Sequence, residues 1–124
     1  MNQQRTLERK RRERAGRRAE IIAAIYYRLL GYSILATRLR TPSGEIDIVA
    51  KRGARLAFIE VKQRRTIAQA LEAIDTTSTR RISAAADWFL ARRPDLAEAD
   101  MGYDIVAIAG WRLQRLTDAW REGE

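Results

Sequence analysis

Acidic side chains stand in two neighbouring apolar runs of the chain, at spacings that could hold a metal ion. Glu45 and Asp47 lie in a run that ends at Ala50, and Glu60 lies with Lys62 in the next run. Clustered carboxylates repel one another, so placing them inside apolar runs costs stability unless a cation compensates. Oxygen ligands select Mg²⁺ or Mn²⁺, which take one or two protein carboxylates together with water and substrate phosphate.

Composition removes most other catalytic chemistry. The chain of 124 residues contains no cysteine and no histidine. Disulfides, thiolate metal sites, cysteine nucleophiles, serine-histidine-aspartate triads and histidine bases are therefore excluded. Carboxylates, lysine, hydroxyls and the backbone remain as the groups that could act.

The two runs predict a β-hairpin, because only the glycine-containing segment Lys51–Arg55 separates them. Side chains alternate along a strand, so burying the aliphatic residues turns the charged ones to the opposite side. We expect one face to carry Ile46, Ile48, Ile59 and Val61, and the other to carry Glu45, Asp47, Glu60 and Lys62. A solvated face with ordinary surface charges is the alternative, but Val49 and Phe58 share that face and favour a partly covered cleft.

Apolar periodicity predicts the elements around the hairpin. Helices are expected over Gly16–Leu30, Thr66–Asp75 and Arg80–Arg93, and further strands over Tyr32–Leu39, Tyr103–Ala109 and, at an edge, Trp111–Leu116. The first helix is expected to bury the stripe Ala19, Ile22, Ile25, Tyr26, Leu29 and Leu30. The core is expected to hold most of Trp88, Trp111, Trp120, Tyr26, Tyr27 and Phe89. This order indicates an α/β fold in which helices flank a mixed sheet.

Positive charge is concentrated at the N-terminus. The formal net charge is +8, and residues 1–18 alone hold eight basic and two acidic side chains, a net +6. We therefore divide the chain into a basic arm over 1–15, disordered or helical, and a single domain over 16–124. This excess predicts a polyanionic partner such as nucleic acid. No signal-peptide core and no run of 18 apolar residues occurs, so we expect a cytoplasmic protein with no membrane partner.

Two motifs carry a resemblance to a known family. They are Gly44-Glu45-Ile46-Asp47-Ile48-Val49-Ala50 and Phe58-Ile59-Glu60-Val61-Lys62-Gln63-Arg64. Together they resemble the signature of the YraN family of predicted endonucleases, within the PD-(D/E)XK, or restriction-endonuclease-like, superfamily. The likeness extends over about residues 16–120 through Gly16-x-x-x-Glu20, Gly31-Tyr32, Arg80-Arg81-Ile82 and Tyr103-Asp104-Ile105-Val106.

The resemblance implies a restriction-endonuclease-like mixed β-sheet with a central hairpin, flanked by helices. It implies that Asp47 and Glu60 bind Mg²⁺ or Mn²⁺, with the Val61 carbonyl and Glu45 as further oxygen ligands. Lys62 would position or deprotonate the attacking water, or neutralise charge that develops on the phosphate. Glu20, on the first helix, would be an added carboxylate that orients the metal.

The implied function is Mg²⁺-dependent endonucleolytic hydrolysis of nucleic-acid phosphodiester bonds, with DNA expected ahead of RNA as the substrate. Contacts with nucleic acid are expected from basic residues of the arm, the hairpin end and the later helix: Arg9, Lys10, Arg11, Arg12, Arg64, Arg65, Arg80 and Arg81. A homodimer is compatible with this function. Two alternatives stay open: a catalytically silent nucleic-acid-binding protein, and an RNA- or ribosome-associated factor that uses mainly the arginine-rich arm.

Overall fold

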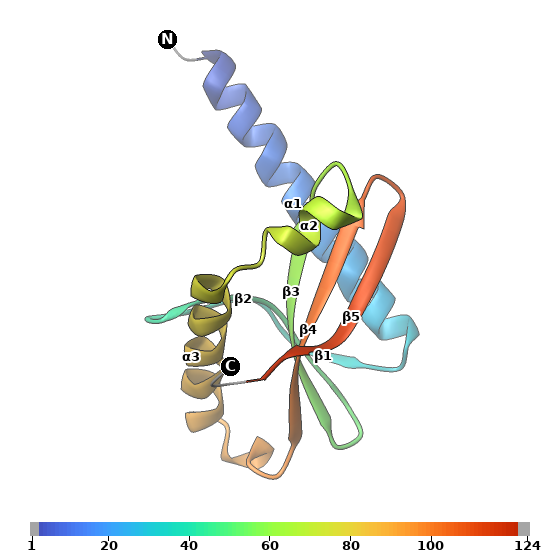
Figure 1. Ribbon diagram of the computed structural model, residues 1–124. Coiled ribbons are helices and arrows are strands. Elements are labelled where there is room, and N and C mark those ends of the chain that lie inside the picture. Colours follow the sequence, from blue (N-terminus) through green and yellow to red (C-terminus); the bar gives the residue numbers. More distant parts are fainter. Residues whose placement is uncertain (1–2, 122–124) are drawn as a thin grey trace.

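The computed structural model describes residues 3–121, which form one mixed sheet with helices on both sides (Figure 1). The elements are α1 (Gln3–Leu29), β1 (Ser33–Thr41), β2 (Gly44–Arg52), β3 (Arg55–Gln63), α2 (Ile67–Glu72), α3 (Thr76–Ala91), the 3₁₀ turn η1 (Pro94–Leu96), β4 (Asp100–Ala109) and β5 (Arg112–Trp120). The strand order is β1-β2-β3-β4-β5, antiparallel except for the parallel pair of β3 and β4. The predicted fold class is confirmed, and it is consistent with a restriction-endonuclease-like fold.

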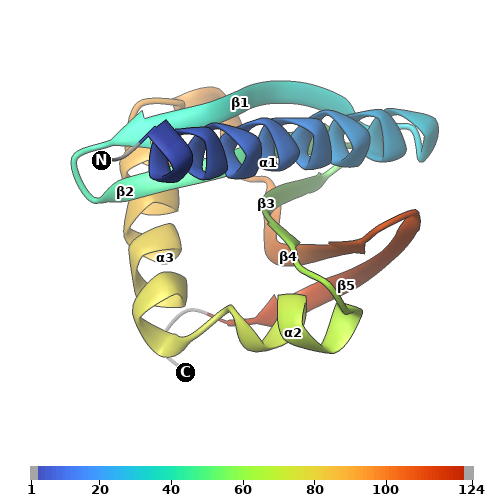
Figure 2. The same ribbon diagram turned by 90° about the horizontal axis from the view of Figure 1, so that it is seen from above.

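Each face of the sheet carries its own hydrophobic core. On one face, α1 packs Tyr27 into a cluster that includes Ile59 of β3. On the other face, α3 packs Phe89 edge to face against Phe58, with the ring centroids 6.1 Å apart. Figure 2 shows α1 and α3 running in different directions on these two sides. Because both faces are covered, β3 and β4 contain runs of consecutive buried residues, 56–59 in β3 and 102–109 in β4.

The first helix buries only part of the predicted stripe: Ala19 is buried and Tyr26 and Leu30 pack against the core, but Ile22, Ile25 and Leu29 do not. Its buried residues are Ala19, Ala23, Ala24 and Tyr27, whereas the large aliphatic side chains Ile21, Ile22, Ile25 and Leu29 are exposed. Alanine lets a helix lie close to a sheet, and the Tyr27 hydroxyl finds a buried partner beneath it. Hydrophobicity favours isoleucine and leucine over alanine, so the sequence pattern placed the buried stripe partly on the neighbouring, exposed side of the helix.

The basic arm continues the first helix. The helix starts at Gln3, and its N-terminal half extends past the rest of the molecule (Figure 1). Buried residues begin only at Ala19, so this half has solvent on most sides. Within residues 3–121, no helix has a stretch long and apolar enough to cross a membrane.

The hairpin of β2 and β3 is confirmed, but its alternation fails at one point. The β1–β2 pairing joins Thr37 to Ile48 and Leu39 to Ile46, so Arg38 lies opposite Asp47. Arg38 has φ +51, in the left-handed region, and the strand turns over there. Ile46 therefore packs on the α3 side with Val49, while Ile48 packs on the α1 side. The expectation that both isoleucines share one face was wrong.

Element boundaries differ most at turns. Lys51, Arg52 and Arg55 belong to strands, so the predicted five-residue loop is a two-residue turn with φ +58 at Gly53, a value that glycine adopts readily. The helix predicted to begin at Arg80 begins at Thr76 instead. The Asp75 side chain caps it by accepting a hydrogen bond from the Ser78 amide at 2.8 Å.

The tryptophans were placed only partly correctly. Trp120 stacks on Tyr103 with the ring centroids 4.8 Å apart, and Trp88 is half-buried. Trp111 is not a core residue, because 91% of its surface is exposed. It lies in the turn between β4 and β5, where no other element covers it.

A buried carboxylate ties the first helix to the far strands. Asp104 of β4 is fully buried and accepts hydrogen bonds from Tyr27 at 2.6 Å, Arg55 at 2.6 Å and Arg115 at 3.4 Å. Burial alone would raise its pKa, but the hydrogen bonds from Arg55, Tyr27 and the Asp118 amide outweigh burial and hold the pKa below the usual aspartate value. Its stabilising contribution is therefore present at neutral pH and is lost as the pH falls through the lowered pKa.

Replacing Asp104 should test this anchor. Asp104→Asn leaves two guanidinium groups in a buried site without their counter-charge, so unfolding in urea should show a loss of about 3–5 kcal/mol. The matched control is Asp118→Asn, because Asp118 also pairs with Arg55, at 3.0 Å, but is 62% exposed. That variant should lose less than about 1 kcal/mol. Similar losses for the two variants would contradict the anchor.

Candidate active site

Asp47 occupies the place where two strands part. Hydrogen-bonded pairing of β2 with β3 runs from Arg52 and Arg55 as far as Ile48 and Ile59. Beyond that pair, the Asp47 carboxylate takes the place of the β2 backbone and accepts a hydrogen bond from the Val61 amide at 2.8 Å. The turn-over of β2 thus leaves Asp47 pointing along the sheet toward β3, and its half-buried carboxylate satisfies a strand amide.

Glu60 precedes the residue whose amide bonds to Asp47, and the Asp47 carboxyl group is close enough to act on the pKa of Glu60. The Glu60 side chain is only 12% exposed. Burial is the main cause that raises its pKa, and the hydrogen bond and negative charge of Asp47 raise it further, against the opposing charge of Lys62. Without a cation, the raised pKa favours the protonated form of Glu60.

Lys62 completes the group on β3. Its ammonium lies 3.9 Å from a Glu60 carboxylate oxygen, and its side chain is 27% exposed. The structure thus brings Asp47, Glu60 and Lys62 together, as predicted, but Asp47 reaches this place through the irregular turn of β2 rather than through the regular alternation that was expected. Their roles stay predictions.

The Val61 carbonyl lies on the same side of β3 as Asp47. In an extended strand, the amide and carbonyl of one residue point in the same direction, and the Val61 amide points at Asp47. Pairing with β2 stops at Ile59, so this carbonyl faces the site rather than a strand partner. Its position suits the predicted role as a third oxygen ligand.

Glu20 approaches the same group from α1. Burial raises its pKa most, the hydrogen bond from Arg38 opposes that rise, and the nearby charge of Asp47 adds to it. The Arg38 guanidinium donates to Glu20 at 3.1 Å. Glu45 lies apart from the pair: it is half-exposed and its ion pair is with Arg40, at 3.9 Å.

The donor set fits a hard divalent cation. Within residues 3–121, no group of three or more acidic residues is gathered closely enough to hold a metal by itself. Mg²⁺ does not need one, because it usually keeps several waters and binds through one or two carboxylates. Asp47 and Glu60 supply those two, and a cation there would favour the ionised form of Glu60 against its raised pKa.

Basic side chains flank the site on both sides of α1. Toward the end of β3, a cavity of about 530 Å³ is lined by Arg12 and Gly16 of α1 and by Lys62 and Arg64. On the other side, a cavity of about 340 Å³ is lined by Glu20, Arg38 and further arginines, Arg17 and Arg28.

The remaining predicted basic residues are more scattered. Arg65 and Arg80 are exposed. Arg81, also exposed, packs against Gly44 at the start of β2, where an added Cβ would lie 3.3 Å from the Arg81 Cβ and 3.5 Å from its carbonyl oxygen. The structure therefore brings Arg81 toward the hairpin.

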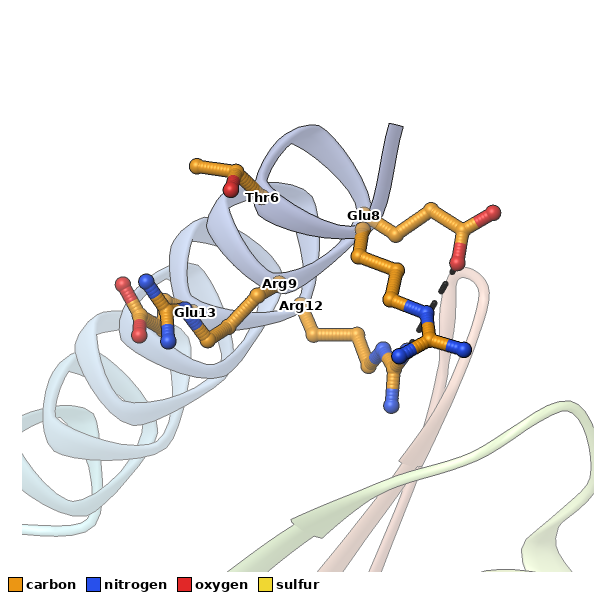
Figure 3. A pocket seen from close by; sticks show the side chains of 6 residues that line it. Thr6, Glu8, Arg9, Arg12 and Glu13 are labelled. Carbon is orange, nitrogen blue, oxygen red and sulfur yellow. Dashed lines mark ion pairs between the residues drawn. The ribbon is translucent and has the colours of Figure 1, made fainter. Parts of the chain in front are cut away.

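A third hollow lies on the projecting half of α1 (Figure 3). It measures about 490 Å³ and is lined only by residues of that helix, among them Arg9 and Glu13. In Figure 3, Glu8 and Arg12 form an ion pair, at 3.8 Å. No carboxylate of the site reaches this hollow, so it belongs to the basic arm.

Sequence reasoning missed Arg38. Its partner Glu20 lies 18 positions away, and a left-handed residue inside a strand leaves no pattern in the sequence. The only available signal was the unequal spacing of apolar residues in β1, which the reasoning interpreted as regular alternation.

Comparison with known proteins places the chain in a family. The model of the family described as "Uncharacterised protein family UPF0102" matches residues 19–108, which include Glu20 and both strands of the hairpin. The chain belongs to the UPF0102 family. This confirms the YraN-type resemblance of the motifs.

Relatives of similar length support this assignment. A UPF0102 protein of Chelativorans sp. is 51% identical over 82% of each chain. A UPF0102 protein of Paramagnetospirillum magneticum is 47% identical over 88% of each chain. One of Rhizobium johnstonii is 46% identical over 89% of this chain and 90% of the relative. The residues that the family model matches include β1, β2, β3 and all but the last residue of β4.

Metal binding should be visible in thermal stability. Mg²⁺ or Mn²⁺ at about 100 times its Kd should stabilise the wild type by about 2.7 kcal/mol and Asp47→Asn by much less. Calorimetric Tm with and without metal measures this. Equal metal-induced shifts in the two proteins would contradict the site.

The same carboxyl contact predicts the opposite effect without metal. Glu60→Gln removes the repulsion, so its Tm in EDTA should exceed that of the wild type. Because the Glu60 pKa is raised, the wild type loses stability as pH rises above the usual glutamate range, and the gain from Glu60→Gln should grow with it. The exposed Glu72→Gln is the control and should leave Tm unchanged.

Proposed function

We propose that this UPF0102 chain is a metal-dependent nuclease that hydrolyses phosphodiester bonds of nucleic acid. The observation that supports it most is the contact of the Asp47 and Glu60 carboxyl groups, with Lys62 3.9 Å from Glu60. Family membership alone does not specify an activity. Two carboxylates and one ammonium group are gathered in a half-buried place, where Asp47 also satisfies the Val61 amide but Glu60 is held next to another acidic group.

Each group of the site would have a separate role in hydrolysis. Asp47, Glu60 and the Val61 carbonyl would hold a Mg²⁺ or Mn²⁺ ion. When bound, that ion would polarise the phosphate and lower the pKa of a water. Lys62 would position this water or neutralise charge on the phosphate. Glu20 would orient the metal-binding carboxylates from α1, with Arg38 balancing its charge.

The basic surface provides the substrate path. The cavity beside Lys62 is lined by Arg12 and Arg64, which can bind phosphates on either side of the reacting one. The projecting half of α1 adds Arg9, Lys10 and Arg11. Phosphate contacts of this kind carry affinity but no sequence information.

A second candidate function is nucleic-acid binding without turnover. It is favoured by the separation of the basic helix from the carboxylates, since charge on that helix can bind a polyanion whatever the site does. The two candidates differ in one result, which is cleavage that depends on both metal and Asp47.

Site variants should separate these candidates. With labelled DNA and RNA in single-stranded, duplex and branched forms, cleavage should require Mg²⁺ or Mn²⁺ and stop in EDTA. Asp47→Asn, Glu60→Gln and Lys62→Gln should each lower the rate by about a thousandfold. Lys51→Gln is the matched control, because Lys51 lies on the same hairpin but bonds to the turn carbonyl of Gly53. Cleavage that persists in Asp47→Asn would overturn the proposal.

Deleting residues 1–15 should test the arm apart from the chemistry. The deletion removes six basic and two acidic side chains, a net +4. Affinity for duplex DNA should fall, and the slope of log K against log salt should flatten by about 0.9 for each lost phosphate contact. Tm should barely change, because buried residues of α1 begin at Ala19. An unchanged salt slope would move the anchoring role to Arg64, Arg65, Arg80 and Arg81.

A further inference from the structure

The turn between β4 and β5 presents an unusual side chain to solvent. Of the exposed large apolar residues in the described part of the chain, Trp111 is the most exposed, at 91%. A tryptophan buries a large area when it packs, so leaving one in water gives up that stabilisation. Packing within the fold therefore does not explain why a tryptophan stands at position 111.

The turn itself does not require tryptophan. Ala109 pairs with Arg112, so Gly110 and Trp111 alone connect the strands. Gly110 has φ +61, which meets the need for a left-handed residue in such a turn. The second turn position usually holds a small polar residue. Trp111 is therefore not explained by local backbone geometry.

The turn lies at the same end of the sheet as the candidate active site. Lys62 pairs with Ala107, and the Arg64 amide donates to the Ile108 carbonyl at 3.1 Å. Trp111 follows Ile108 by three residues, which is about 10 Å along a strand. Figure 1 shows this turn and the end of β3 together at the upper end of the sheet.

Arginines lie at the exposed ring and at the adjacent end of β3. The Arg112 guanidinium lies over the Trp111 ring, 5.8 Å from its centroid. Arg64, whose amide bonds to Ile108, lines the basic cavity that includes Lys62. An exposed aromatic ring near this cavity offers a stacking surface for a base, and the arginines offer counter-charges for its phosphates.

We infer that Trp111 stacks on an unpaired base of the nucleic acid whose backbone lies in the cavity beside Lys62. This rests on the proposed function, and it narrows the substrate class to single strands or to duplexes with unpaired nucleotides next to the reacting phosphate. Bases inside an intact duplex already stack on one another and leave no free face for the ring. A partner protein with an uncharged surface would not account for Arg112 and Arg64 near this turn.

Binding measured without metal tests the inference separately from cleavage. Fluorescence anisotropy in EDTA would compare a labelled single strand with the blunt duplex of the same sequence. Trp111→Ala should weaken binding of the single strand about tenfold, and Trp111→Phe by less than about threefold, since phenylalanine keeps an aromatic face. Duplex affinity should change by less than about twofold. The salt slope should not change, because no charge is removed.

Leu29→Ala is the matched control. Leu29 is 82% exposed, and Leu30 next to it accepts a hydrogen bond from Arg52, at the opposite end of the hairpin from Lys62. This variant should bind both probes as the wild type does. The tryptophan fluorescence of the protein gives a second readout. The single strand should quench it less in Trp111→Phe, which lacks the stacking tryptophan, than in the wild type.

Three results would overturn the inference. They are equal losses for single strand and duplex in Trp111→Ala, no loss for either, and a change from dimer to monomer in sedimentation of that variant, which would make the turn a protein contact. If Trp111→Ala shows the selective loss while no nucleic acid is cleaved, the nuclease proposal fails and the stacking site stands. If cleavage depends on Asp47 but Trp111→Ala changes nothing, only the stacking site fails.

Discussion

The hydrogen bond from the Val61 amide to Asp47 is the interaction on which the candidate site depends. It forms where β2 turns away from β3, at a strand amide that would otherwise lack a partner. By satisfying that amide, Asp47 allows the strands to part and fixes its own carboxylate next to Glu60. Arg38 lies opposite Asp47 in β1 and has a left-handed backbone conformation, so β1 turns over at the same position as β2. One local irregularity therefore creates both the opening and its acidic lining.

Asp104, which is fully buried, and Glu60, whose side chain is 12% exposed, have opposite electrostatic environments. Asp104 receives two guanidinium groups and a tyrosine hydroxyl, which hold it ionised and fasten α1 to β4 and β5. Glu60 faces another carboxyl group and only one ammonium, at 3.9 Å, and so favours its protonated form. The first arrangement stabilises the fold. The second leaves a deficit of positive charge, as expected where a cation from outside the chain completes the site.

Much of the fold follows from sequence patterns, and the failures have physical causes. The hairpin, the element order and the meeting of Asp47, Glu60 and Lys62 were predictable, because period-two alternation holds along β3 and turn residues bound each strand. The face on which Ile46 packs was not predictable. Alternation reverses beside Arg38, a left-handed residue of the paired strand β1, and the composition of the strands gives no sign of it. The full buried stripe of α1 was not predictable either, because alanines, rather than the more hydrophobic isoleucines, let the helix lie close to the sheet. The Glu20–Arg38 pair depends on both features.

The alanine stripe of α1 sets how freely that helix can vary. Ala19, Ala23 and Ala24 touch the sheet with almost no exposed surface, so any larger side chain there would lift the helix away. Glu20 stands within this stripe, and lifting the helix would carry it away from Asp47. On the opposite side, Ile21, Ile25 and Leu29 have room to change. The positions that look least demanding by size are thus the ones at which substitution is most restricted.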